Sequence, residues 1–115
     1  SGGDVRFRQP EGDEPPIWDS TQPYQPKGRV RRSADYENPH GEWTTIEVYA
    51  VGDQAIHLVN GHVVLAIDNI RQREGGSLTK GHFQIQSEGA EVYYRDIRVR
   101  SISAIPAALA IEANL

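Results

Sequence analysis

The chain has 115 residues, no cysteine and a formal net charge of −4. Its length fits one small domain, and the lack of cysteine excludes disulfides, zinc–thiolate sites and thiol nucleophiles. The negative charge disfavours nucleic acid as a partner, and no apolar run reaches the roughly 18 residues of a transmembrane segment. The chain also lacks methionine, so we expect a processed or excised piece of a longer protein.

The first 40 residues divide into two parts. Apolar and charged residues alternate within residues 1–8, which predicts a short strand. Residues 9–40 hold six of the seven prolines and show no helical or strand period, so we predict an irregular arm. Long ordered segments of this kind often border a functional site. The aromatic residues Trp18 and Tyr24 are therefore candidates for a lid over a ligand.

Residues 41–103 carry the strand signals and are predicted to form the antiparallel β core. The first of these strands precedes Gly52. Within it, Ile46, Val48 and Ala50 fall on one face and polar residues on the other. This is the alternation of a half-buried strand, and we expect the apolar face to pack against the core.

A β-hairpin is predicted around Asn60-Gly61, because a type I′ turn needs positive φ at both central residues. A two-residue turn places Val59 opposite His62, and each further pair then lies one residue further along both strands. His57 then faces outward, away from the core. The opposite, uniformly apolar face consists of Ile56, Leu58, Val63, Leu65 and Ile67.

The last third of the chain contains two further strand signals. Residues 82–88 alternate regularly, whereas the alternation of residues 91–102 breaks near Arg95-Asp96, where we expect a β-bulge. Residues 104–115 form a tail with helical propensity that is too short to be stable alone. At least five antiparallel strands without internal repeats predict an all-β fold, as half of a sandwich or as a jelly roll.

The strands also carry a resemblance to the C-terminal part of the 3-keto-disaccharide hydrolase family, over about residues 41–102. The resemblance implies a concanavalin-like jelly roll, here incomplete on its N-terminal side, in a periplasmic or extracellular protein. A second copy or a missing N-terminal segment is then expected to complete the sheet. The shared motifs are Gly41-Glu42-Trp43, His57 before Asn60-Gly61, Gln86-x-x-Gly89 and Tyr94-Arg95-Asp96-Ile97.

The resemblance implies cleavage of 3-keto-glycosides or 3-keto-disaccharides, by elimination and hydration or by hydrolysis. A ketone at C3 acidifies the C2 proton, so elimination needs a base, an electrophile for the enolate and a proton for the leaving oxygen. The candidate catalytic residues are His57, Glu88 and Arg95. Each also has a structural interpretation. His57 would be a histidine with its hydrogen bonds satisfied in the sheet, and Glu88 a solvated carboxylate. Arg95 would be an ion-pair partner of Asp96 or Glu91.

An oligosaccharide or modified sugar is the expected ligand, and Gln86, Trp43, Tyr93 and Arg6 are the candidate binding residues. The amide would orient a hydroxyl, and the aromatic rings would stack on a pyranose. A divalent cation could act as the electrophile, with His57 and Glu88 as its candidate ligands. The spacing of these groups matches no named metal motif.

Two other functions compete with this hypothesis. A non-catalytic carbohydrate-binding module is the first, because jelly rolls host lectins as well as enzymes. A conventional glycosidase is the second, and it needs two carboxylates at a defined spacing. An enzyme of the 3-keto type predicts that His57 and Glu88 converge on one sugar, whereas a lectin predicts aromatic stacking without a base.

Overall fold

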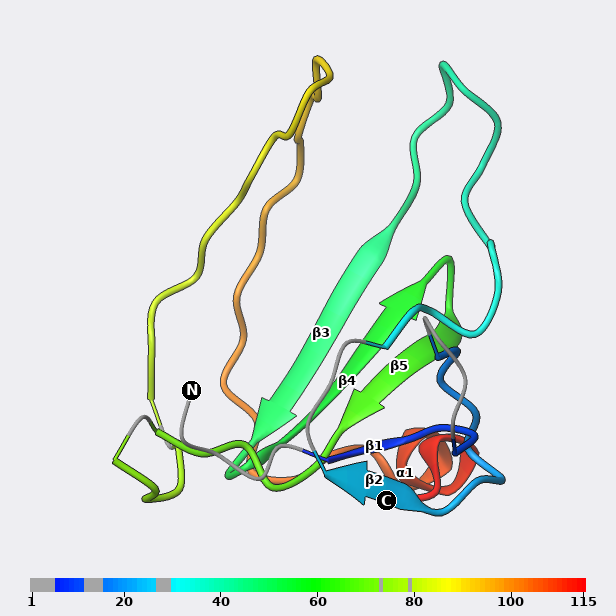
Figure 1. The fold of residues 1–115 in the computed structure, drawn as a ribbon. Helices are drawn as coiled ribbons and strands as arrows, with labels where there is room; N and C mark the ends of the chain where they lie inside the picture. The colour runs from blue at the N-terminus through cyan, green and yellow to red at the C-terminus, as the bar shows by residue number, and fades with distance from the viewer. Residues whose placement is uncertain (1–5, 12–15, 27–29, 73, 79) are drawn as a thin grey trace.

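The structure is a computed structural model that describes residues 6–11, 16–26, 30–72, 74–78 and 80–115. The named strands pair only antiparallel, in a two-stranded sheet β1-β2 and a three-stranded sheet β3-β4-β5, which confirms the expected all-β class (Figure 1). The elements of the described part are β1 (Arg6–Arg8), β2 (Tyr24–Pro26), β3 (Ile46–Val51), β4 (Gln54–Val59), β5 (His62–Ile67) and α1 (Ala107–Ala113).

The β4–β5 hairpin turns at Asn60-Gly61, as predicted, with φ of 47° and 80°. The first two pairs, from Val59 opposite His62, also follow the prediction. Beyond them the register shifts by one residue, so that His57 pairs with Leu65 and not with Val64. The predicted continuous register is therefore wrong past the second pair, because a bulge sets one extra residue of β5 against β4.

The faces of β3 are the reverse of our expectation. Tyr49 lies opposite the core residue Ile56, so its side chain points to the core side of the sheet. Ile46 and Val48 lie on the other side and are 67% and 53% exposed. Val48 lies opposite His57, so these apolar residues share a face with the histidine, which we call the open face.

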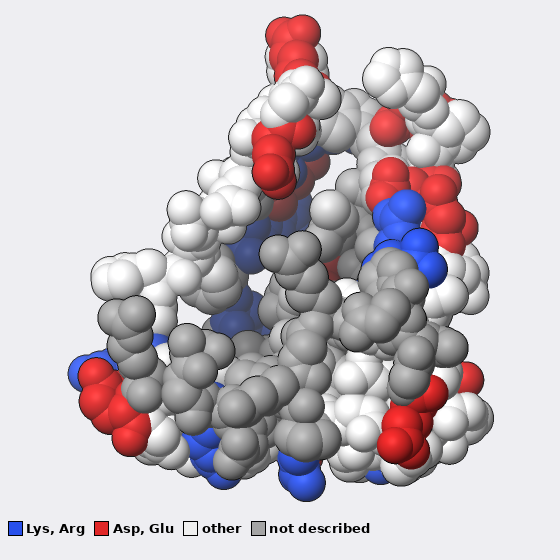
Figure 2. Space-filling model, in the orientation of Figure 1, with Lys and Arg blue, Asp and Glu red and all other residues white. Residues whose placement is uncertain are grey.

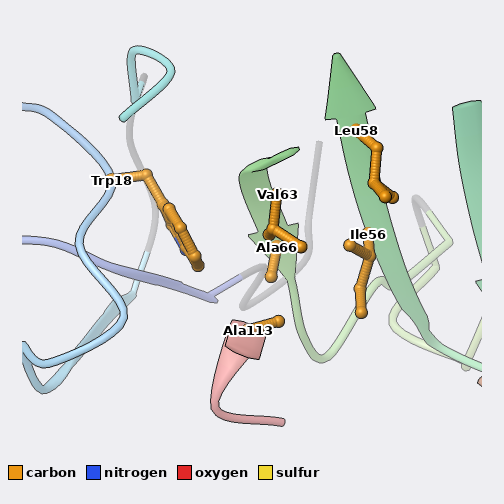
Figure 3. Packing of buried hydrophobic residues seen from close by; sticks show 6 residues of the cluster. All are labelled: Trp18, Ile56, Leu58, Val63, Ala66 and Ala113. Atoms are coloured by element: carbon orange, nitrogen blue, oxygen red, sulfur yellow. The ribbon is translucent and has the colours of Figure 1, made fainter. Parts of the chain in front are cut away.

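The core is small and lies against β4 and β5 (Figure 3). The two strands supply Ile56, Leu58, Val63 and Ala66, and the helix α1 supplies Ala113. Trp18 closes the cluster from the proline-rich segment and is only 5% exposed. The expectation that Trp18 forms part of a lid is wrong, because its ring has the environment of a core residue. The segment predicted to be irregular also contributes β2.

The two sheets and the helix are joined through the backbone and side chains of β1. The backbones of Arg6 and Asp68 exchange two hydrogen bonds, which place β1 beside the end of β5. Arg8 donates from Nε to the carbonyl of Asn114 at 3.1 Å, at the end of α1. The predicted helical tail is thus confirmed as a docked helix. Residues 1–5, which held the start of the predicted first strand, lie outside the described residues.

Residues 81–103 form two long extended segments joined by a turn, which we call the hairpin arm (Figure 1, yellow and orange). The structure assigns no strand between 80 and 105, so the two strands expected here are wrong. Strand formation needs a hydrogen-bonded neighbour, and among the described residues β3 pairs with β4 alone. The apolar residues of the arm are consequently exposed, among them Phe83, Ile97 and Val99.

Candidate functional site

His57 lies in the middle of β4 on the open face, between Val48 of β3 and Leu65 of β5. The side chain is half-buried, and this burial lowers the pKa of His57 below its ordinary value, because desolvation penalises the imidazolium. The lowered pKa favours the neutral form of the imidazole. A neutral imidazole that still reaches solvent has the protonation state of a general base.

The turn next to this site is fixed by one side chain. Asn60 accepts a hydrogen bond from the backbone N–H of Thr45 at 3.0 Å and donates to the carbonyl of Tyr36 at 2.7 Å. These bonds tie the loop before β3 to the tip of the β4–β5 hairpin. The ring of Tyr36 in turn stacks on His62, with centroids 4.0 Å apart. The ring of His62 is thus packed against the ring of Tyr36.

Trp43 and Arg95 are two predicted site residues that the structure brings together. The guanidinium carbon of Arg95 lies 4.1 Å from the centroid of the Trp43 ring, which is a cation–π contact. Arg95 also lies 3.8 Å from the carboxylate of Asp96, the ion pair foreseen in its structural interpretation. Trp43 is 47% exposed, so the indole can still contact a ligand.

Glu88, Gln86 and Tyr93 lie near the turn of the hairpin arm, which is remote from β4 in Figure 1. The carbonyl of Gln86 accepts a hydrogen bond from Tyr94 at 2.6 Å. Tyr93 is 71% exposed and donates to Glu91. Within the described part of the chain, no hydrogen bond or ion pair involves Glu88, and no contact links it to His57. The predicted convergence of these two groups is therefore not seen.

Arg6 occupies a structural position. Its guanidinium pairs with the carboxylate of Asp68, which is 13% exposed and also accepts from Gln54 at 3.4 Å. The same guanidinium lies 4.8 Å from the ring centroid of Tyr24, and Arg8 lies 4.2 Å from it. These contacts hold β1, β2 and β5 together. Tyr24, expected in a lid, is accordingly held between two arginines.

The metal hypothesis gains no support from the geometry. Across the residues that the structure describes, no three His, Asp or Glu side chains lie close enough to hold a metal ion. A shallow pocket of about 410 Å³ lies near Trp18, and its lining contains none of the candidate catalytic or sugar-binding residues. Its lining consists of Pro10, Ile17, Trp18, Asp19, Ser20 and Ser33.

Comparison with known proteins agrees with the resemblance seen in the sequence. A protein-family model described as the 3-keto-alpha-glucoside-1,2-lyase-like domain matches residues 5–100. The match includes the proline-rich segment, which the motifs above did not cover. No curated protein and no solved structure gives a significant match. No helix in the described part is long and apolar enough to cross a membrane. Because the match spans most of the chain, the protein belongs to the family of 3-keto-alpha-glucoside-1,2-lyase-like domains.

Proposed function

We propose that the chain cleaves 3-keto-glycosides by elimination, with His57 as the base that removes the C2 proton. The observation that carries this proposal is the half-buried, neutral imidazole on the open face of a family member. The family's description as a 1,2-lyase fits a reaction across C1 and C2 of the sugar.

The step balances without a cofactor. The imidazole of His57 takes the proton from C2, and the electron pair of that C–H bond forms a double bond between C1 and C2. The C1–O bond breaks, and the leaving oxygen takes up a proton to give the alcohol. The 3-keto group is needed because it delocalises the charge that develops at C2. Water then adds to the unsaturated product.

Trp43 and Arg95 are proposed to hold the second sugar of the substrate. Trp43 precedes Val48, the partner of His57, by five residues, which corresponds to roughly 16 Å along an extended chain. A monosaccharide bound at His57 is too short to contact Trp43, so contact with both residues needs a substrate of at least two sugar units. The keto ring would lie at His57 and the other ring against the indole and guanidinium.

The experiment compares a 3-keto-disaccharide with its unoxidised parent, with and without EDTA, in the wild type and in His57→Gln. We expect release of sugar from the ketone only, and a loss of rate of about 100-fold or more in His57→Gln. His82→Gln is the matched control, because His82 is exposed on the hairpin arm. Cleavage that is unaffected by His57→Gln would refute the assignment of the base.

A carbohydrate-binding module is the second candidate, and the exposed aromatic side chains of Trp43 and Tyr93 favour it. The same experiment separates the two functions. A module binds the disaccharide but releases nothing from either the ketone or its parent. In that case Trp43→Ala would abolish binding and His57→Gln would leave it intact.

A further inference from the structure

The second segment of the hairpin arm, residues 91–100, is extended but has no backbone partner. Among the described residues, none of its backbone groups takes part in a backbone–backbone hydrogen bond, and all ten of its residues are exposed. Free N–H and C=O groups on an extended segment are a template for another strand. The segment also exposes apolar and aromatic side chains, which mark interaction sites. These residues are Val92, Tyr93, Tyr94, Ile97 and Val99.

Charge is distributed unevenly along the arm. Glu88 and Glu91 lie at the turn, whereas three arginines and one aspartate follow between residues 95 and 100. Figure 2 shows the same polarity, with acidic side chains at the tip of the arm and basic side chains nearer to the body of the protein. Two such segments attract each other when they run antiparallel, because the acidic end of one then meets the basic end of the other.

One antiparallel register places a complementary residue of a second copy opposite every position of the segment. The pairs are Glu91 with Arg100, Val92 with Val99, Tyr93 with Arg98, Tyr94 with Ile97, and Arg95 with Asp96. Opposite charges, apolar pairs and a ring facing a guanidinium all stabilise cross-strand neighbours. A shift of the register by one residue is unfavourable in either direction, because it sets Arg95 or Asp96 opposite its own copy.

The backbone at Asp96 makes this register possible. Residues directly opposite each other project to the same side of a sheet, and a two-fold axis between the strands preserves that side. In an unbroken strand Val92 and Val99 would project to opposite sides. Asp96 has a φ of 53°, in the left-handed region, and such a residue interrupts the alternation. The interruption lets both valines share one side with Tyr94 and Ile97.

We propose that residues 91–100 are a dimer interface, in which this segment pairs antiparallel with the same segment of a second copy. A second copy is favoured over an unrelated strand because the segment is complementary to itself in charge and in apolar positions. The two copies gain backbone hydrogen bonds that each segment lacks alone. The proposal does not rest on the proposed function, because no step of the cleavage enters the pairing.

Reversal of charge tests the interface in the full chain. We expect sedimentation velocity at micromolar concentrations to show a dimer in the wild type. Glu91→Arg and Arg100→Glu each set like charges opposite each other at both ends of the pair, so each should weaken association about tenfold or more. Glu91→Arg/Arg100→Glu restores the opposite charges and should dimerise like the wild type. Glu74→Arg is the matched control, because Glu74 is exposed outside the arm.

Cysteine cross-linking tests the register, since the chain has no cysteine of its own. A mixture of Val92→Cys and Val99→Cys should form a disulfide-linked dimer on oxidation, because Cα atoms of opposite residues lie about 5.5 Å apart. Either variant alone should stay uncross-linked, because its two thiols lie roughly 20 Å apart along the pair. None of the tested variants alters Trp43 or Arg95, which the proposed function uses.

A wild type that stays monomeric up to about 1 mM would overturn the proposal. Single charge reversals that leave the dimer intact would do the same, as would a combined variant that fails to restore it. Cross-links in either cysteine variant alone, and not in the mixture, would overturn the register. Circular dichroism verifies that each variant is folded, and the cross-linking result decides if the charge variants are not.

Discussion

The side chain of His57 is half-buried, and this burial has a consequence for stability as well as for chemistry. Its pKa is lowered in the folded protein by desolvation, while in the unfolded chain it keeps the ordinary value of about 6.5. The unfolded state therefore binds the proton more readily. The stabilisation is fully present above pH 6.5 and is lost as the pH falls through the folded-state pKa.

We predict that His57→Gln reduces the fall in the free energy of unfolding between neutral and mildly acidic pH. Urea denaturation at a series of pH values measures this fall in both proteins. The exposed His82 is the matched control, and His82→Gln should keep the dependence of the wild type. If His57→Gln loses stability toward acid as steeply as the wild type, the imidazole is not the group responsible.

The two tryptophans differ in burial, and this difference predicts different costs of substitution. Trp18 is 5% exposed and packs in the core, whereas Trp43 is 47% exposed. Trp18→Ala should lower the free energy of unfolding by about 3–5 kcal/mol. Trp43→Ala should cost about 1 kcal/mol or less, mainly the contact with Arg95. Equal losses, measured by denaturant unfolding, would contradict the assigned positions.

At the scale of elements, the β4–β5 hairpin was predictable because its turn is encoded locally. Asn60-Gly61 supplies positive φ at two successive positions, and type I′ turns strongly prefer that dipeptide. The bulge at His57/Leu58 was not predictable, since it depends on how two neighbouring strands pack. The faces of β3 were assigned wrongly for a related reason. Tyr49 is amphipathic, and its ring packs against the core although its hydroxyl bonds to Glu47.

The Asn60-Gly61 turn leads to a prediction about the free energy of unfolding. Gly61→Ala should lower the free energy of unfolding by about 1–2 kcal/mol, because the new side chain would stand at a φ of +80°. Gly76 has as much free space around it without a positive φ, so Gly76→Ala should change the stability little. Chemical denaturation of both variants checks this, and similar costs at the two positions would contradict the strain argument.

Within α1, Ala113 is the residue that is fully buried where the helix docks. Ala113 is fully buried in the core cluster, while Ala108 on the same helix is exposed. Ala113→Glu should lower the free energy of unfolding by several kcal/mol, because it places an unpaired carboxylate in the core. Ala108→Glu should be nearly neutral. Thermal unfolding of the two variants tests the docking, which would be disproved if they behaved alike.

For the whole molecule, the class of fold and the family could be predicted from the sequence, but the arrangement of distant segments could not. The alternation in residues 82–102 has the signature of strands, yet the structure gives these residues no strand. Alternation reports which side chains could share a face, and strand pairing depends on a neighbour elsewhere in the chain. The enzyme hypothesis expected Glu88 to converge with His57 on one sugar, but Glu88 lies next to the turn of the hairpin arm, which is remote from β4 (Figure 1).

The geometry of the candidate site was predictable to a similar extent. His57 was identified from its place in a hairpin with one apolar face, which is a local feature. The pairing of Trp43 with Arg95 joins residues 52 positions apart and could not be read from spacing. The ion pair of Arg6 is equally non-local, since Asp68 lies 62 residues away.

The central claim is that cleavage begins with removal of the C2 proton. A 3-keto-disaccharide carrying deuterium at C2, followed by mass spectrometry and by rate, tests it most directly. The account predicts a primary isotope effect in the wild type and a released keto sugar that has lost the label. A sugar released at full rate with its C2 deuterium retained would show direct hydrolysis at C1 and contradict the account.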